Sequence, residues 1–131
     1  MKAIFDTNLF VGAAFNRRSA SAKLIERVRA GDVTLVWDDA TRDETRRILT
    51  HIPPIRWEDV ADLFAESNRW GGGTHSDAVL FVEDSEDRKF AALALATGAT
   101  LVSSDSDLLD HRERLPVCTP GEFLSCIDAT S

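Results

Sequence analysis

The stretch Met1-Lys2-Ala3-Ile4-Phe5-Asp6-Thr7-Asn8 opens the chain and decides how the rest can fold. Its apolar part is too short for a helix and is typical of a buried strand. Such a strand delivers Asp6 at its C-terminal end, which is where open α/β sheets form their sites. A second strand-like run, residues 100–104, also ends at acids, Asp105 and Asp107. Two strands that deliver acids at the same kind of end predict a shared acidic pocket.

The remaining chain alternates strand-like and helix-like segments, which is typical of a parallel sheet covered by helices. We therefore predict an α/β fold, a three-layer sandwich with a mostly parallel sheet of four to five strands, in a single domain of residues 1–131. The run 78–82 is apolar at every position, as in a strand buried on both faces. The expected strands are residues 2–6, 33–37, 78–82 and 100–104, with a short fifth at 115–118.

Capping residues and apolar spacing predict the helices between these strands. Residues 57–68 are expected to form an amphipathic helix with Val60, Leu63 and Phe64 inward. Gly98 closes the clearest helix, and Thr119-Pro120-Gly121-Glu122 is a capping box that opens the last one. Residues 10–15 are expected to form a short helix or a turn. The further expected helices run from Ser19 or Ser21 through Ala30, from residues 38–41 through about Thr50, over residues 57–68, over residues 86–97, and from Pro120 onward.

Composition limits the class of protein. The chain of 131 residues has a net charge of −7, which argues against a general nucleic-acid coating protein but not against a nuclease that uses metal ions. No apolar run approaches the roughly 20 residues of a membrane span, and the N-terminus does not resemble a signal peptide. Two cysteines without a CxxC motif and three scattered histidines argue against structural zinc. We expect a cytoplasmic protein without membrane contact.

The acids that follow the expected strands form the main candidate site. Asp87 leads a helical series with Phe90, Ala91, Ala94 and Leu95, which predicts that it lies on the buried face. Buried carboxylates repel one another and become protonated unless a cation holds them, and hard oxygen ligands suit Mg²⁺ or Mn²⁺. The candidate acids are Asp6, Glu44, Asp84, Asp87, Asp105 and Asp107.

Each acid also has a purely structural explanation. Asp6 can cap a local turn, and Glu44 stands three residues after Thr41, where it can complete a capping box. Asp84 and Asp87 can stabilise the positive end of a helix dipole. One acid of the pair that follows residues 100–104 is expected to be a turn or cap residue, and we favour Asp105 over its neighbour for the site.

These residues resemble a PIN domain, a family of metal-dependent nucleases. The resemblance rests on Ile4-Phe5-Asp6-Thr7-Asn8-Leu9-Phe10, on Glu44 with Arg47-Ile48-Leu49, on residues 84–90 and on residues 101–109. Residues 117–124 resemble a bacterial and archaeal subgroup of VapC-like ribonucleases, usually described as toxin components of toxin–antitoxin pairs.

The resemblance implies a parallel sheet and an acidic pocket with one or two Mg²⁺ or Mn²⁺ ions that cleaves single-stranded RNA. It further implies a possible cognate antitoxin protein as partner, and we expect a homodimer. Thr7 would be a hydroxyl near the first acid, and Asn8 would position substrate. The acids that it assigns to catalysis and metal binding are Asp6, Glu44, Asp87 and Asp105, with Asp84 and Asp107 as additional candidates.

Substrate contacts and two other functions stay open at this point. Arg17-Arg18 and Arg88-Lys89 can hold phosphates or can be solvated surface charge. The three tryptophans can stack on bases or pack in the core. The chain can instead be an aspartyl phosphatase or phosphotransfer domain with Asp6 as nucleophile. It can also be a non-catalytic module whose acidic pocket receives an Arg or Lys of a partner.

Overall fold

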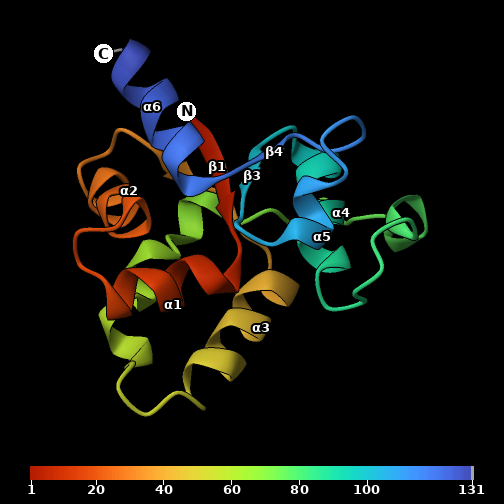
Figure 1. Cartoon of the computed structure of the whole chain (residues 1–131). Coiled ribbons are helices and arrows are strands. Elements are labelled where there is room, and N and C mark those ends of the chain that lie inside the picture. Colours follow the sequence, from red (N-terminus) through yellow and green to blue (C-terminus); the bar gives the residue numbers. More distant parts are fainter. Residues whose placement is uncertain (131) are drawn as a thin grey trace.

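A computed structural model describes residues 1–130, and within them four strands form one parallel sheet (Figure 1). The order across the sheet is β2-β1-β3-β4, so β1 and β3 are central. The predicted α/β class is confirmed, with four strands that are shorter than their expected runs. The strands are β1 (Lys2–Phe5), β2 (Thr34–Leu35), β3 (Thr100–Val102) and β4 (Val117–Cys118).

Six α-helices and four short 3₁₀ turns connect and cover the described strands. In Figure 1, α2 and α6 lie on one side of the sheet and α4 and α5 on the other, while α1 and α3 lie beyond the C-terminal ends of the strands. Among the described residues, no helix is long and apolar enough to span a bilayer. The helices are α1 (Thr7–Phe15), α2 (Ala20–Arg29), α3 (Asp39–Leu49), α4 (Arg88–Thr97), α5 (Ser106–Leu109) and α6 (Pro120–Thr130), and the turns are η1 (Trp57–Asp59), η2 (Ala61–Leu63), η3 (Glu66–Asn68) and η4 (Ser76–Val79).

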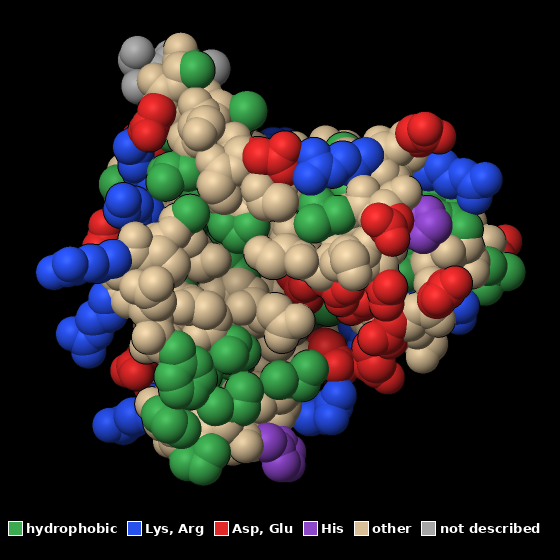
Figure 2. Space-filling view, viewed as in Figure 1, with side chains coloured by type: hydrophobic (Ala, Val, Ile, Leu, Met, Phe, Trp, Pro, Cys, Tyr) green, Lys and Arg blue, Asp and Glu red, His purple; other side chains and the backbone are tan. Residues whose placement is uncertain are grey.

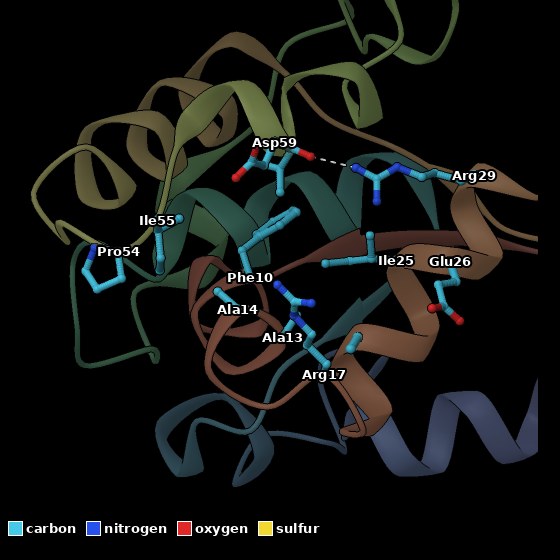
Figure 3. A pocket seen from close by; sticks show the side chains of 12 residues that line it. Phe10, Ala13, Ala14, Arg17, Ile25, Glu26, Arg29, Pro54, Ile55 and Asp59 are labelled. Atoms are coloured by element: carbon cyan, nitrogen blue, oxygen red, sulfur yellow. Dashed lines mark hydrogen bonds between the residues drawn. The ribbon is translucent and has the colours of Figure 1, made fainter.

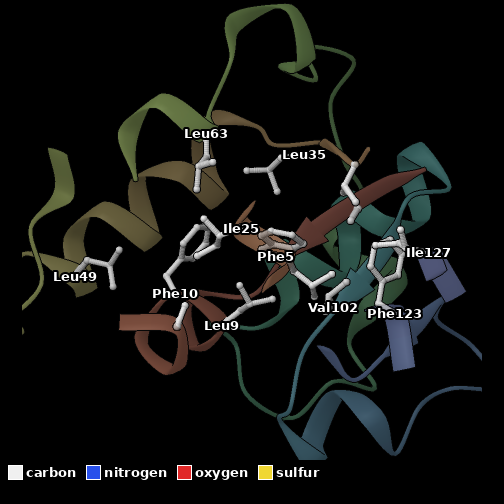
Figure 4. Close-up of a cluster of buried hydrophobic side chains, with 14 of the residues drawn as sticks. Phe5, Leu9, Phe10, Ile25, Leu35, Leu49, Leu63, Val102, Phe123 and Ile127 are labelled. Atoms are coloured by element: carbon white, nitrogen blue, oxygen red, sulfur yellow. The ribbon is translucent and has the colours of Figure 1, made fainter. Parts of the chain in front are cut away.

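Alternation along the strands gives the sheet two apolar faces, each covered by its own core. Phe5 and Val102 point into a cluster with side chains of α1, α2 and α6 (Figure 4). Ile4 and Leu101, one residue earlier on the same strands, pack into a second cluster with α4. Because successive strand residues point to opposite faces, one pair of short strands contributes to both cores. This arrangement is the predicted three-layer sandwich.

Local sequence fixes several helix ends as expected. The Ser19 hydroxyl accepts a hydrogen bond from the Ala22 amide and caps α2. Gly98 ends α4 in a left-handed conformation with φ of 75°, which a residue with a Cβ seldom adopts. The capping box of α6 is present, because the Glu122 carboxylate accepts a hydrogen bond from the Thr119 amide at 2.9 Å and the Thr119 hydroxyl accepts one from the Glu122 amide at 3.1 Å.

The expected strand at 78–82 is wrong. This segment forms η4 and the turn that follows it. Val79 and Val82 are fully buried, whereas Leu80 between them is 62% exposed. Burial every third residue is the period of a 3₁₀ turn and not of a strand. A short apolar run does not reveal its period, and the positions on both sides of β1 are already occupied by β2 and β3.

The expected helix at 57–68 is also wrong, although its inward residues are correct. The segment is divided into η1, η2 and η3. Phe64 breaks the helical path with φ of −89° and ψ of 69°, and its ring stacks on Phe10 and contacts Trp37 and Trp57. Packing of this aromatic ring against the core therefore overrides helix propensity.

Helix α4 begins at Arg88, two residues later than expected, and Asp87 is its N-cap residue. The predicted buried face includes Phe90, Ala91 and Ala94, which are buried, but Leu95 is 43% exposed and lies outside the core. Leu93, which was not in the predicted series, is fully buried in its place. The buried stripe of α4 is therefore wider than the series predicted and is centred on different residues.

Leu93→Ala is expected to lower the free energy of unfolding by about 2–5 kcal/mol, because it removes a fully buried side chain and leaves a cavity. Leu95→Ala, two residues along the same helix, is expected to change it by less than about 1 kcal/mol. Urea unfolding followed by circular dichroism measures both. Equal losses of the free energy of unfolding in the two variants would contradict the orientation of α4, in which Leu93 is buried and Leu95 is exposed.

Candidate metal centre

Acidic side chains gather in a pocket of about 270 Å³ at the C-terminal edge of the sheet. Figure 2 shows them in a hollow between α3 and α5. Parallel strands bring Asp6, Glu44 and Asp105 here, because the C-terminal ends of the strands, and the helix starts that follow them, lie at one edge. Asp84 and Asp87 come from the turn and the start of α4, the helix that leads into β3. The pocket is lined by Asp6, Thr7, Asn8, Glu44, Arg47, Ile48, Asp84, Glu86, Asp87, Phe90 and Asp105.

Asp6 lies buried at the base of this pocket, directly after β1. Its amide donates to the Val102 carbonyl, and its Oδ2 accepts a 2.7 Å hydrogen bond from the Ser103 hydroxyl. The same hydroxyl oxygen accepts from the Asp105 amide at 3.0 Å. Burial raises the pKa of Asp6 and the nearby Asp105 charge adds to this, although the Ser103 hydrogen bond acts in the opposite direction.

Asp87 is the least compensated acid of the site. It is buried at the N-terminus of α4, and its Oδ2 has no hydrogen-bond partner among the residues that the structure describes. Burial, hydrogen bonding with Asp105 and the charge of Asp6 together raise the pKa of Asp87 to about 8. A buried carboxylate oxygen without a donor is costly, so this atom is positioned to receive a cation.

Asp105 and Asp107 complete a group of three acids with Asp87, in which one carboxylate oxygen from each lies within 4.8 Å of the others. Asp105 is also the N-cap of α5, because its Oδ1 accepts from the Asp107 amide at 2.9 Å. Asp105 therefore has both the cap role and a place in the pocket. Asp84 lines the pocket, and its exposed side chain accepts from the Glu86 amide.

Glu44 enters the pocket from α3 with a side chain that is only 5% exposed. The capping-box explanation of this residue is wrong, because the box at the start of α3 joins Asp38 to Thr41. The Glu44 carboxylate instead accepts from Arg47 at 2.8 Å and from Lys89 at 3.2 Å. Burial alone would raise the pKa of Glu44, but these two hydrogen bonds lower it below its usual range.

Thr7 and Asn8 occupy different positions at the start of α1. Thr7 is buried, and its hydroxyl forms a 3.0 Å hydrogen bond with that of Thr45 on α3. This contact ties α1 to the helix that carries Glu44, and Thr45 and Ser103 are supporting residues that the sequence did not single out. Asn8 is exposed and lines the pocket.

The structure does not bring the predicted arginines into the acidic pocket. Arg17 lies in a separate, partly apolar pocket of about 410 Å³ between α1, α2 and residues 54–60 (Figure 3). Arg18 is exposed beyond the end of α1. Arg88 turns back toward the turn after η4, where its Nε donates to the Val82 carbonyl at 2.7 Å. The arginine that does line the acidic pocket is Arg47.

Comparison with known protein families identifies the family to which these acids belong. The family model of the PIN domain matches residues 2–107, which include all the acids described above. This chain belongs to the PIN domain family. PIN domains are generally nucleases, so the family indicates a hydrolase that acts on nucleic acid. Comparison with curated proteins and with solved structures gives no significant match.

The donor set of this PIN domain fits a divalent cation. PIN nucleases usually use divalent metals, and the acids here offer several carboxylate oxygens, of which the buried Asp87 Oδ2 has no donor among the described residues. Hard oxygen ligands of this kind are those that Mg²⁺ and Mn²⁺ prefer. Asp87, Asp105 and Asp107, whose carboxylate oxygens lie within 4.8 Å of one another, and Asp6, which lines the same pocket, are the residues that would hold such an ion.

We expect Asp87→Asn to stabilise the metal-free protein at alkaline pH. An acid with a raised pKa contributes stability that is present below its unfolded value, near 3.9, and lost as pH rises through about 8. Asparagine has no such charge. In EDTA, the Tm of the variant should therefore rise relative to that of the wild type between pH 5 and pH 9, by more than about 5 °C.

Differential scanning calorimetry at several pH values measures this gain. Asp77→Asn, which removes an exposed carboxylate outside the pocket, is the control and should show no such pH dependence relative to the wild type. A difference in Tm between Asp87→Asn and the wild type that stays constant from pH 5 to pH 9 would contradict the raised pKa of Asp87.

Proposed function

We propose that this PIN domain protein is a metal-dependent endoribonuclease that cleaves single-stranded RNA. The observation that carries the proposal is the buried, unpartnered Oδ2 of Asp87 beside Asp105 and Asp107, in the part of the chain that the structure describes. Crowded buried carboxylates stay ionised near neutral pH only if a cation compensates them. A site that gathers buried carboxylates at a sheet edge without a cation to balance them is suited to metal-assisted hydrolysis.

Mg²⁺ or Mn²⁺, when bound, would orient a phosphodiester and lower the pKa of an attacking water. Hydrogen bonds from a side chain and from the backbone keep the acids in place for this. Ser103 holds the carboxylate of Asp6, and the Asp107 amide holds that of Asp105. Such supporting hydrogen bonds fix the orientation of metal ligands. Asn8, exposed at the pocket, can hydrogen-bond the substrate.

The choice of RNA rests on motif resemblance. The segments around Asp6 and Asp105 resemble those of PIN ribonucleases, and residues 117–124 resemble the toxin subgroup. We propose on this basis that the protein acts in the cytoplasm as the toxin of a toxin–antitoxin pair, with a cognate antitoxin protein as partner, and that it forms a homodimer.

Figure 2 shows apolar side chains gathered over α1 and the end of α3, beside the acidic hollow. Phe15, at the end of α1, is 62% exposed. An exposed apolar surface of this kind supports a protein partner.

Cleavage of labelled single-stranded RNA by the purified protein in Mn²⁺, Mg²⁺ or EDTA tests the proposal. We expect cutting with either metal and none in EDTA. Asp6→Asn and Asp87→Asn should each lower the rate by more than about 100-fold, the upper end of losses caused by changes outside the metal ligands. Asp77→Asn should cut at the wild-type rate.

Three results would count against the proposal. Cutting that persists in EDTA would show that the activity needs no metal. Undiminished cutting by Asp87→Asn would remove the acid cluster from the reaction. Absence of both cutting and Mn²⁺ binding in the wild type would favour a non-catalytic pocket that receives a cationic side chain of a partner.

A further inference from the structure

The acidic pocket has two electrostatically different sides. On one side, Asp6, Asp87 and Asp105 line the pocket together, and the pKa values of Asp6 and Asp87 are raised. On the other side, each oxygen of Glu44 accepts a hydrogen bond from a cation, Oε1 from Arg47 and Oε2 from Lys89. Among the residues that the structure describes, the aspartate side of the pocket therefore has no cation to balance its carboxylates, whereas the Glu44 side already has two.

Glu44 is poorly suited to hold a divalent cation while these two bonds persist. Both cationic nitrogens lie within 3.2 Å of its carboxylate oxygens, and like charges at such distances repel strongly where solvent is limited. Lys89 is further fixed by Glu86, 3.1 Å away. A metal ion is therefore better received by the aspartates on the other side of the pocket.

Arg47 is the cation that is accessible to a substrate in the pocket. It is the only Lys or Arg among the described residues that line the pocket, and its side chain is 59% exposed. The hydrogen bond from Arg47 to Glu44 uses Nη2, whereas a guanidinium carries five N–H donors in a rigid fork that matches a phosphate. Arg47 can thus contact Glu44 and a phosphate simultaneously.

An RNA strand that enters an acid-rich pocket also needs such a contact. Asp84 and Glu86 line the pocket with Glu44, and they repel phosphates. A charge-assisted hydrogen bond from an arginine compensates this repulsion and fixes the register of the strand.

We propose, on the basis of the function proposed above, that Arg47 binds a phosphate of the RNA next to the cut and that Glu44 is a positioning residue that holds Arg47 and Lys89. In this assignment the metal is held by the aspartates, and Glu44 contributes through the cations that it orients. Arg17, Arg18 and Arg88, which lie outside the acidic pocket, have no part in the phosphate contact.

Steady-state cleavage of single-stranded RNA in Mn²⁺, together with calorimetric Mn²⁺ titration, tests this assignment. Arg47→Ala should raise KM about tenfold, the value of one charge-assisted hydrogen bond, and change kcat and Mn²⁺ affinity by less than about threefold. Arg47→Lys, which keeps the charge, should recover part of the loss. Glu44→Gln should raise KM in the same way, and the double variant Glu44→Gln/Arg47→Ala should lose little more than either single variant.

Arg46→Ala is the matched control. It removes the same charge from the next position of α3, where the exposed Arg46 guanidinium lies over the Trp57 ring at 5.9 Å. Its KM should stay within about twofold of the wild type. If Arg46→Ala and Arg47→Ala raise KM equally, the effect is one of net charge and the phosphate contact is overturned.

Three further results would overturn the assignment. If Glu44→Gln loses Mn²⁺ binding as completely as Asp87→Asn does, then Glu44 is a metal ligand and not an anchor. If the wild type binds Mn²⁺ and cuts RNA but Arg47→Ala has an unchanged KM, the phosphate contact alone fails and the ribonuclease function stands. A wild type that neither binds nor cuts RNA overturns both proposals.

Discussion

Parallel pairing of β1 with β3 is the constraint on which the rest of the site depends. Ile4 lies opposite Leu101 and Phe5 opposite Val102, so each strand places one apolar residue in each core. The next residue on β1 is Asp6, whose amide continues the ladder to the Val102 carbonyl. A shift of this register by one residue would turn every side chain to the opposite face. The hydrophobic pattern that makes the sheet therefore also fixes the acids at its edge.

Burial and charge then act against each other at this edge. The two cores exclude water from Asp6 and Asp87, which raises the pKa of both carboxyl groups. The fold tolerates this because a cation can relieve it, and because the acid on the α3 side, Glu44, already has two cations of its own. On the proposed function, the same pocket would hold a metal ion with an anchored arginine beside it. A PIN domain of net negative charge can approach nucleic acid through these local positive charges.

Sequence reasoning located Asp6 and Asp105 because an apolar run followed at once by an acid identifies the end of a buried strand. It did not identify Ser103, because a serine after a strand is equally typical of a turn. It also failed at residues 78–82, where an all-apolar run conceals its period, and at 57–68, where the ring of Phe64 breaks the helix. Helical spacing alone did not show that Arg47, and not one of its charged neighbours on α3, lines the pocket. Which arginine reaches the pocket depends on the hydrogen bond to Glu44 and on the contact of α3 with α4.

On the proposed function, the aspartates at the sheet edge hold a divalent cation. The most direct measurement is the anomalous X-ray scattering of a crystal grown with Mn²⁺. We expect an anomalous peak next to the Asp87 carboxylate, between Asp6 and Asp105, with Glu44 still hydrogen-bonded to Arg47. An acidic pocket without such a peak at saturating Mn²⁺, or a peak only elsewhere on the molecule, would contradict this metal site.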